Sequence, residues 1–197
     1  LDSHRAKPLT EHMIENPTYF QQRIPDLDKS IIVPRYCNTG DFAAAKAVGA
    51  NILGSDPEIV NALYNKGFFK ASCERMGIPT VQGKVVDLEN ISRDALRAVV
   101  DRYSERTGEA IIKSLSQSSG AGIMDGTQWT SLPPKGKILI EEKYELDKEY
   151  NIQAIIDEND KFRLLSVSRQ AVNGFSHQGN IYVDVHDLDE KAMEQVR

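Results

Sequence analysis

Residues 111–123 read Ile111-Ile112-Lys113-Ser114-Leu115-Ser116-Gln117-Ser118-Ser119-Gly120-Ala121-Gly122-Ile123, which places one lysine between an apolar stretch and a loop of small residues. Isoleucines favour a buried strand, and serine and glycine leave backbone N–H groups available to oxyanions. The lysine adds a compact positive charge. The run therefore predicts a strand followed by a phosphate-binding loop, although Ser/Gly-rich loops more often only connect elements.

The residues from Ala110 onward are predicted to form a mostly antiparallel sheet. Their apolar side chains recur with a period of two, which is typical of strands. The predicted strands are 110–113, 138–142, 150–157 and 162–170. A turn at 158–161 joins the last two strands as a hairpin, and Asn173-Gly174 marks a further turn.

The residues before Ala110 predict alternating short strands and helices. The expected strands are 31–33, 51–53 and 81–86, and the expected helices cover 41–48 and the residues from 57 onward. Ser55 is the predicted N-cap of the second helix, and Glu58 completes a capping box.

Two more helical faces follow from the spacing of apolar residues. Phe69, Cys73 and Met76 share one face of the segment that Gly77 ends. A third helix is capped by Ser92 and stops at Gly108. The sequence therefore predicts an α/β (α+β) protein with a boundary near residue 108.

Composition and charge exclude several classes of protein. The 197 residues, 40% hydrophobic and 27% charged, are typical of a globular protein with one medium core or two small ones. A net charge of −5 argues against nucleic-acid and anionic-membrane partners. Only Cys37 and Cys73 are present, which fits reduced thiols and a cytoplasmic location. No apolar run reaches the roughly 18 residues that a membrane span needs. A start at Leu1 and an end inside an expected helix predict a segment of a longer protein.

Three further features stand in a fixed order around the Lys113 loop. Lys66 begins a helix after Asn65, the run Glu141-Glu142-Lys143-Tyr144 ends an apolar strand, and Glu149 lies seven residues beyond Glu142. With Gly77-Ile78-Pro79 between the two lysines, this order resembles the ATP-grasp superfamily over roughly half of the chain.

Two groups within that superfamily carry motifs similar to those of this chain. The run from Glu142 to Glu149 is similar to the hinge of D-alanine:D-alanine ligases. Ser119-Gly120-Ala121-Gly122 resembles the loop of the ATP-grasp peptide ligases of the pheganomycin pathway, whose N-terminal order is similar to Gly54-Ser55-Asp56-Pro57 followed by Lys66.

The resemblance implies a nucleotide-binding site. Lys66 and Lys113 would neutralise the phosphates, the Glu142 carbonyl and the Tyr144 N–H would meet adenine, and Glu149 would accept from the ribose hydroxyls. The implied cofactor-binding residues are Lys66, Lys113, Ser116, Ser118, Ser119, Gly120, Gly122, Glu142, Lys143, Tyr144 and Glu149. Arg169 and His177 are the implied catalytic residues, with Arg169 facing a phosphate or a substrate carboxylate and His177-Gln178-Gly179-Asn180 forming a turn on the γ-phosphate side.

The resemblance also implies a division of the chain. Residues 1–54 would be a small α/β segment ahead of the ATP-grasp fold, and 55–108 its helical linker. Residues 109–183 would form an antiparallel nucleotide lid, and 184–197 would begin the catalytic part. No metal ligands are expected in this chain, because its last acidic residues are more simply the start of a helix. The ligands of Mg²⁺ are expected beyond residue 197.

The implied function is the ATP-binding portion of a magnesium-dependent ligase. Such an enzyme activates a carboxylate as an acyl phosphate, which an amine or a thiol then attacks. Its partners would be ATP and a small-molecule or peptide carboxylate, and a homo-oligomer is left open. A degenerate, non-catalytic ATP-grasp module that senses nucleotide is the alternative. A plain α+β interaction domain, whose loop binds nothing, is the third.

Overall fold

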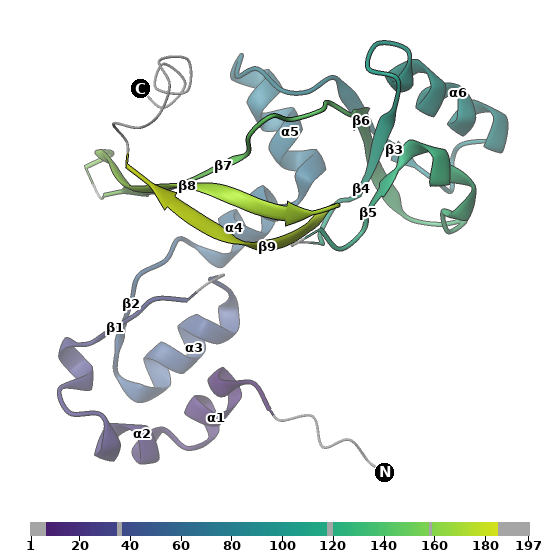
Figure 1. Ribbon diagram of the computed structural model, residues 1–197. Helices are drawn as coiled ribbons and strands as arrows, with labels where there is room; N and C mark the ends of the chain where they lie inside the picture. Colours follow the sequence, from purple (N-terminus) through teal and green to yellow (C-terminus); the bar gives the residue numbers. More distant parts are fainter. Residues whose placement is uncertain (1–6, 35–36, 118–119, 158, 185–197) are drawn as a thin grey trace. The chain divides into compact units, whose positions relative to one another are not determined.

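The computed structural model describes residues 7–34, 37–117, 120–157 and 159–184, and the chain forms two compact units, residues 1–77 and 78–197 (Figure 1). Each unit has its own secondary structure and is described separately. The predicted boundary near residue 108 does not separate them, because it runs through the second unit. No helix in the described part of the chain has the length and apolar character needed to cross a membrane.

The first unit is mainly helical, with one small parallel pair of strands. Its elements are α1 (Leu9–Glu15), α2 (Pro17–Arg23), the 3-10 helix η1 (Leu27–Lys29), β1 (Ile31–Ile32), α3 (Thr39–Val48), β2 (Asn51–Ile52), α4 (Pro57–Tyr64) and α5 (Lys66–Arg75). β1 and β2 are parallel, and a capping box between Asn38 and Asp41 begins α3. Met13, Leu27, Ala44 and Val48 form the core. The predicted strands and helices of this region are confirmed, with the strands shorter than expected.

Two details of this unit differ from the prediction. Asp56, rather than Ser55, caps α4, because its carboxylate accepts the backbone N–H of Glu58 at 2.7 Å. The expected apolar face of α5 is largely exposed: 52% of Phe69 and 66% of Met76 is accessible to solvent. The periodicity identified a helix correctly, but it did not identify the side of the helix that packs within its own unit.

The second unit begins with a four-stranded antiparallel sheet covered by one helix. The elements are β3 (Gly83–Asp87), α6 (Arg93–Ser104), β4 (Ala110–Ser114), β5 (Ile123–Asp125), the 3-10 helix η2 (Gly126–Ser131) and β6 (Lys137–Glu142). The strand order is β3-β6-β4-β5. The oxygen of Ser92 caps α6 as predicted, and Leu96, Val100 and Tyr103 are buried. They pack with Ile112 and Ile140 in the core of the unit.

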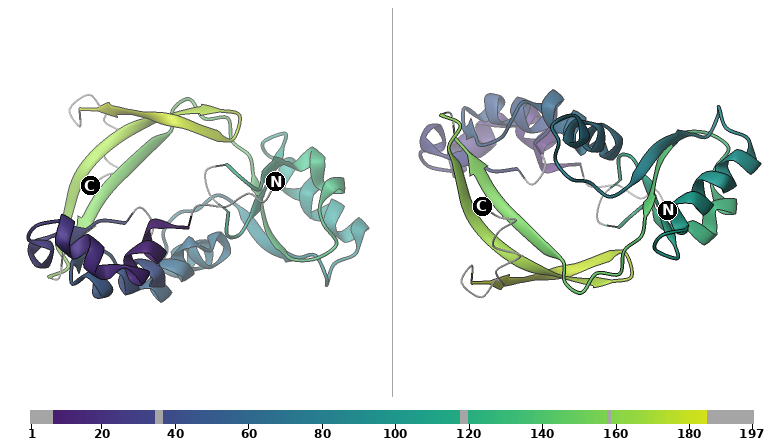
Figure 2. Two further views of the ribbon diagram at one scale, coloured as in Figure 1. Left: turned by 90° about the horizontal axis from the view of Figure 1, so that it is seen from below. Right: turned by 90° about the horizontal axis from the view of Figure 1, so that it is seen from above.

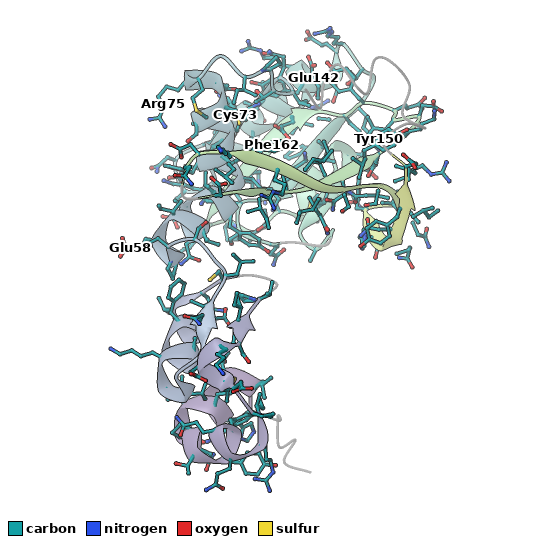
Figure 3. All side chains as sticks on the ribbon, turned by 90° about the vertical axis from the view of Figure 1, so that its left-hand side faces the viewer. Glu58, Cys73, Arg75, Glu142, Tyr150 and Phe162 are labelled. Atoms are coloured by element: carbon teal, nitrogen blue, oxygen red, sulfur yellow. The ribbon has the colours of Figure 1, made fainter. Side chains whose placement is uncertain are left out.

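A three-stranded antiparallel sheet completes this unit. β7 (Tyr150–Ile156), β8 (Phe162–Asn173) and β9 (Ser176–Val183) are paired in that order, and Figure 2 shows them as a long curved ribbon. Tyr150 and Phe162, the first residues of β7 and β8, lie toward opposite ends of the sheet (Figure 3). The predicted hairpin is confirmed. β5 and β9 were not predicted as strands, and they extend the two sheets beyond the predicted set.

Candidate nucleotide-binding site

Lys113 lies on β4, the strand that leads into the Ser/Gly-rich loop, and it forms an ion pair. Its Nζ is 2.7 Å from Oε2 of Glu141 on β6. Lys113 is directly opposite Leu139, so Glu141, two residues further, lies on the same face of the sheet. The Lys113 side chain is 26% exposed and that of Glu141 8%. The cation is therefore accessible from solvent, and the carboxylate beside it would compete with a phosphate for it.

The loop after β4 returns tightly to β5. The backbone N–H of Ser114 donates to the carbonyl of Gly122 at 2.7 Å. Gly120 and Gly122 have φ angles of +81° and +68°, a region that favours glycine. Ser116 is exposed, while the predicted phosphate-binding residues Ser118 and Ser119 lie outside the described residues. The described ends of the loop thus lead the chain directly from β4 into the neighbouring strand β5.

The end of β6, where the resemblance implies a hinge, is held by backbone hydrogen bonds on both sides. The N–H of Glu142 donates to the carbonyl of Gln82 at 2.9 Å, and that of Lys143 donates to the carbonyl of Glu109 at 3.0 Å. Tyr144 is the first residue beyond these bonds. The Tyr144 hydroxyl donates to the buried Glu142 carboxylate, and this hydrogen bond raises the pKa of Tyr144. The side chains therefore hold the backbone at the position where the sequence predicts adenine.

Lys143, another predicted nucleotide contact, has its ammonium between two carboxylates. Nζ is 2.6 Å from Oε2 of Glu109 and 2.6 Å from Oδ1 of Asp125. Its hydrogen bonds to Asp125 and Glu109 raise the pKa of Lys143 above its usual 10.5. This cluster of one cation and two anions disfavours a direct contact between Lys143 and a phosphate.

The raised pKa of Lys143 predicts a difference in stability at alkaline pH. A lysine whose pKa is higher in the folded state stabilises the fold fully below its unfolded pKa, and the contribution is lost as the pH rises through the folded value. Replacing Lys143 by methionine should therefore reduce the free energy of unfolding at pH 8 by about 0.5–1 kcal/mol, as for partly exposed ion pairs. Denaturant unfolding at pH 8 and pH 12 would measure this prediction. The difference in the free energy of unfolding between wild type and K143M should be smaller at pH 12 than at pH 8. An equal difference in the free energy of unfolding at both pH values would contradict this expectation.

Glu149 and Arg169 line one hollow at the end of the three-stranded sheet. Its volume is about 310 Å³, and its wall also includes Lys148 and Ile181. The carbonyl of Glu149 accepts the backbone N–H of Gln170 at 2.8 Å, which fixes the entry into β7 beside β8. The structure thus brings together the predicted ribose acceptor and the predicted anion-binding arginine, which are twenty residues apart in the sequence.

His177 differs from its predicted setting. The run His177-Gln178-Gly179-Asn180 lies within β9 and is not a turn. The register shifts between Ala171 and Val172, so that Gly179 and His177 are their respective partners and one extra residue lies between them. The imidazole is exposed, and Nε2 is 3.3 Å from Oδ1 of Asn180.

Lys66 belongs to the first unit, whereas the other described site residues belong to the second. It is the first residue of α5 and is half-buried. Asn65 caps this helix by accepting the N–H groups of Gly67 and Phe68 at 3.0 and 3.1 Å. The cap fixes the backbone of Lys66 at the helix start, as the sequence predicted.

The described residues contain no group of three or more His, Cys, Asp or Glu side chains that could hold a metal ion. The described residues therefore form no metal site with three protein ligands of their own, and the ligands of Mg²⁺ stay a prediction for the part of the protein beyond residue 197. Of the acidic residues near the end of the chain, only Asp184 is among the described residues.

Sequence reasoning missed the groups that surround Lys143. Glu109 precedes β4 and Asp125 ends β5, so the two acids flank neighbouring strands. Their approach depends on the pairing of β4 with β5, a strand of three residues that periodicity does not detect. Recognising Ile123-Met124-Asp125 as a strand would have predicted the cluster.

Comparison with known proteins supports the same assignment of the fold. No family model and no curated protein match the sequence. D-alanyl-alanine synthetase A from Vibrio cholerae O1 biovar eltor is 17% identical, with a TM-score of 0.60 over 85% of this chain and 56% of that one. A biotin carboxylase–beta-gamma-ATP complex from Campylobacter jejuni is 18% identical, with a TM-score of 0.63 over 84% of this chain and 40% of that one. D-alanine–D-alanine ligase from Bacillus anthracis, complexed with ATP, is 17% identical, with a TM-score of 0.55 over 93% and 60%.

The chain therefore has part of the ATP-grasp fold that these structures share. It spans between 40% and 60% of their length. The ATP-grasp fold that the order of motifs implied is confirmed for this part of the chain, as is the mixed α/β architecture with antiparallel sheets.

Proposed function

We propose that this chain is the ATP-binding portion of an ATP-grasp ligase. One observation carries the proposal: the strand with Lys113, the loop after it and the hinge at the end of β6 all lie in one antiparallel sheet. In that sheet the loop follows β4, and the hinge follows the neighbouring strand β6. A nucleotide beside this sheet would place its adenine at Glu142 and Tyr144 and its phosphates toward Lys113.

The proposed contacts divide the work between backbone and side chains. The Glu142 carbonyl accepts from the adenine amino group, and the Tyr144 N–H donates to a ring nitrogen. Lys113 binds phosphate oxygens as a point charge. Arg169, in the hollow with Glu149, offers a planar set of donors to a phosphate or to a substrate carboxylate.

Within the longer protein that we infer, ATP supplies the phosphoryl group that activates a carboxylate. An amine or a thiol then displaces the phosphate. The residues described above bind and orient the nucleotide for this transfer, and binding of this kind supplies much of the catalysis of phosphoryl transfer. The magnesium ligands are proposed to lie outside the described residues.

The contact between Glu149 and ribose gives the sharpest test of the site. A carboxylate that accepts from both hydroxyls of a vicinal diol loses one hydrogen bond when the 2′-hydroxyl is absent. Glu149→Gln should weaken ATP binding about tenfold, since hydrogen bonds to charged groups contribute about 1.5–3 kcal/mol. It should also reduce the preference for ATP over 2′-deoxy-ATP.

Isothermal titration of wild type and E149Q with both nucleotides would measure this prediction. Glu145→Gln is a matched control, because Glu145 is exposed in the same segment and does not line the hollow. Equal selectivity for the two nucleotides in wild type and E149Q would overturn the ribose contact. Failure of the wild-type protein to bind either nucleotide would overturn the proposed function.

A further inference from the structure

We propose that Lys143 is a positioning residue that holds the Ser/Gly-rich loop between β4 and β5, here called the glycine loop, in place through the turn between β8 and β9. This set of contacts is called the latch. The inference rests on the proposed function, because the loop is the part of the site expected to cover the phosphates. It changes the role of Lys143 from a nucleotide contact to a residue that acts through its neighbours.

The ammonium of Lys143 connects the ends of three strands. Its two ion pairs, each at 2.6 Å, reach Glu109 ahead of β4 and Asp125 at the end of β5. Its own backbone continues β6 and donates to the Glu109 carbonyl. The Lys143 side chain is 31% exposed, so these contacts form in a partly protected environment. Lys143 therefore fixes the end of the sheet from which the hinge begins.

A third contact of the same ammonium reaches the other sheet of the unit. Nζ lies 5.6 Å from the centre of the Phe175 ring, within the range of a cation–π interaction. Phe175 is half-buried and lies in the turn between β8 and β9. The position of this turn relative to the four-stranded sheet is thus tied to Lys143.

The same turn between β8 and β9 is in close contact with the glycine loop. A Cβ added to Gly120 would be 1.9 Å from the carbonyl oxygen of Phe175 and 3.2 Å from the Cα of Ser176. Only a residue without a side chain permits this approach, and the φ of +81° favours glycine independently. The backbone of the loop therefore rests directly on the backbone of the turn.

These contacts form one series from the hinge to the loop. Lys143 holds the turn through the Phe175 ring, and the turn supports the loop through the Phe175 carbonyl. The adenine-binding end of β6 and the phosphate-covering loop are consequently coupled by residues that touch no nucleotide. Weakening the latch should open the loop more often and shorten the time that a nucleotide stays bound.

The latch can be tested first without nucleotide. Hydrogen exchange followed by mass spectrometry on peptides covering 115–125 and 171–178 should be faster in Lys143→Met, by roughly three- to tenfold, as expected for loss of partly exposed ion pairs and one cation–π contact. Lys143→Arg keeps the charge and should restore protection. Lys137→Met, at the exposed start of the same strand, is the matched control and should leave both peptides unchanged. Unchanged exchange of these peptides in K143M would overturn the latch.

The second measurement uses the dissociation rate of a fluorescent ATP analogue. K143M should increase this rate by roughly three- to tenfold, and K143R should return it toward the wild-type value. Gly120→Ala, which pushes the loop away from the turn, should cause a similar increase. Because both changes open the same latch, the double variant K143M/G120A should dissociate no faster than the faster single variant.

The outcomes separate this inference from the proposed function. If wild type binds the analogue and the two changes multiply each other's effect, the loop and Lys143 act independently and the latch is wrong. If wild type does not bind the analogue, the proposed function fails, and the exchange experiment still decides whether Lys143 holds the loop.

Discussion

Replacing Lys113 by alanine is expected to abolish the rise in melting temperature that ATP gives to this protein. Lys113 offers a partly exposed ammonium at the start of the loop. Loss of a charged hydrogen bond to phosphate costs about 1.5–3 kcal/mol, or up to about a hundredfold in affinity. At an ATP concentration about ten times Kd, ligand linkage contributes about 1.4 kcal/mol, and a hundredfold weaker Kd leaves less than about 0.1 kcal/mol. Thermal unfolding with and without ATP measures this difference.

The same substitution also lowers the stability of the protein without ATP, because it removes one partner from the buried carboxylate of Glu141. The quantity to compare is therefore the shift that ATP causes and not the melting temperature itself. The double variant Lys113→Met/Glu141→Gln removes both charges of this ion pair, and glutamine keeps a hydrogen-bonding group at the buried position. It should fold and still show no shift. Lys84→Ala, an exposed lysine on β3 of the same sheet, should keep the full shift. An unchanged shift in K113A would contradict the assignment of Lys113.

The order of chemical motifs was sufficient to predict the fold, although no single motif was specific. Strands β4, β6, β7 and β8 were identified because they are rich in apolar and β-branched residues and are bounded by turn residues. β5 and β9 were missed for different reasons. β5 is too short to show a period, and β9 begins with the polar run from Ser176 to Asn180. Both strands form through pairing with a longer neighbour, which a local pattern does not reveal.

The candidate site was predicted as a set of residues but not as a set of contacts. Lys113 and the hinge were found because they stand at strand ends, where backbone and side chains can meet a ligand. The ion pair of Lys113 with Glu141 depends on the register that sets Lys113 opposite Leu139. A shift of one residue would have turned Glu141 to the other face of the sheet. Register arises from the whole sheet, so a local pattern does not reveal that the Glu141 carboxylate meets Lys113.

The arrangement of charges supports the different roles proposed for the two lysines of this unit. Lys113 has one carboxylate partner at 2.7 Å, and the pair is neutral. Lys143 has two at 2.6 Å, and that cluster carries a net negative charge. An approaching phosphate is attracted more weakly to the second cluster. Lysine is therefore the proposed phosphate ligand at position 113 and the proposed positioning residue at position 143.

Ile140→Ala is expected to destabilise the second unit strongly without removing the nucleotide site. Ile140 is 0% exposed and packs in the core with Ile112 and the α6 side chains. Truncating a buried isoleucine leaves a cavity and costs about 2–5 kcal/mol. Denaturant unfolding should show a lower midpoint with an unchanged slope. Val85→Ala on β3 is the matched control, because Val85 is 40% exposed and should cost clearly less. A cost in I140A no larger than that in V85A would contradict the central place of β6 in this core.

The two substitutions should differ in their response to ATP. Ile140 alternates with Leu139 and Glu141 along β6, so its side chain faces the core while Lys113 and Glu141 lie on the opposite face. The cavity in I140A therefore leaves the phosphate side of the sheet intact. ATP should raise the melting temperature of I140A about as much as that of wild type, although the melting temperatures of I140A with and without ATP are both lower than those of wild type. K113A should show the reverse, with a smaller loss of stability and no response to ATP. This contrast is expected because the side chains on one face of β6 contribute mainly to folding, whereas those on the other face contribute mainly to the proposed binding of ATP.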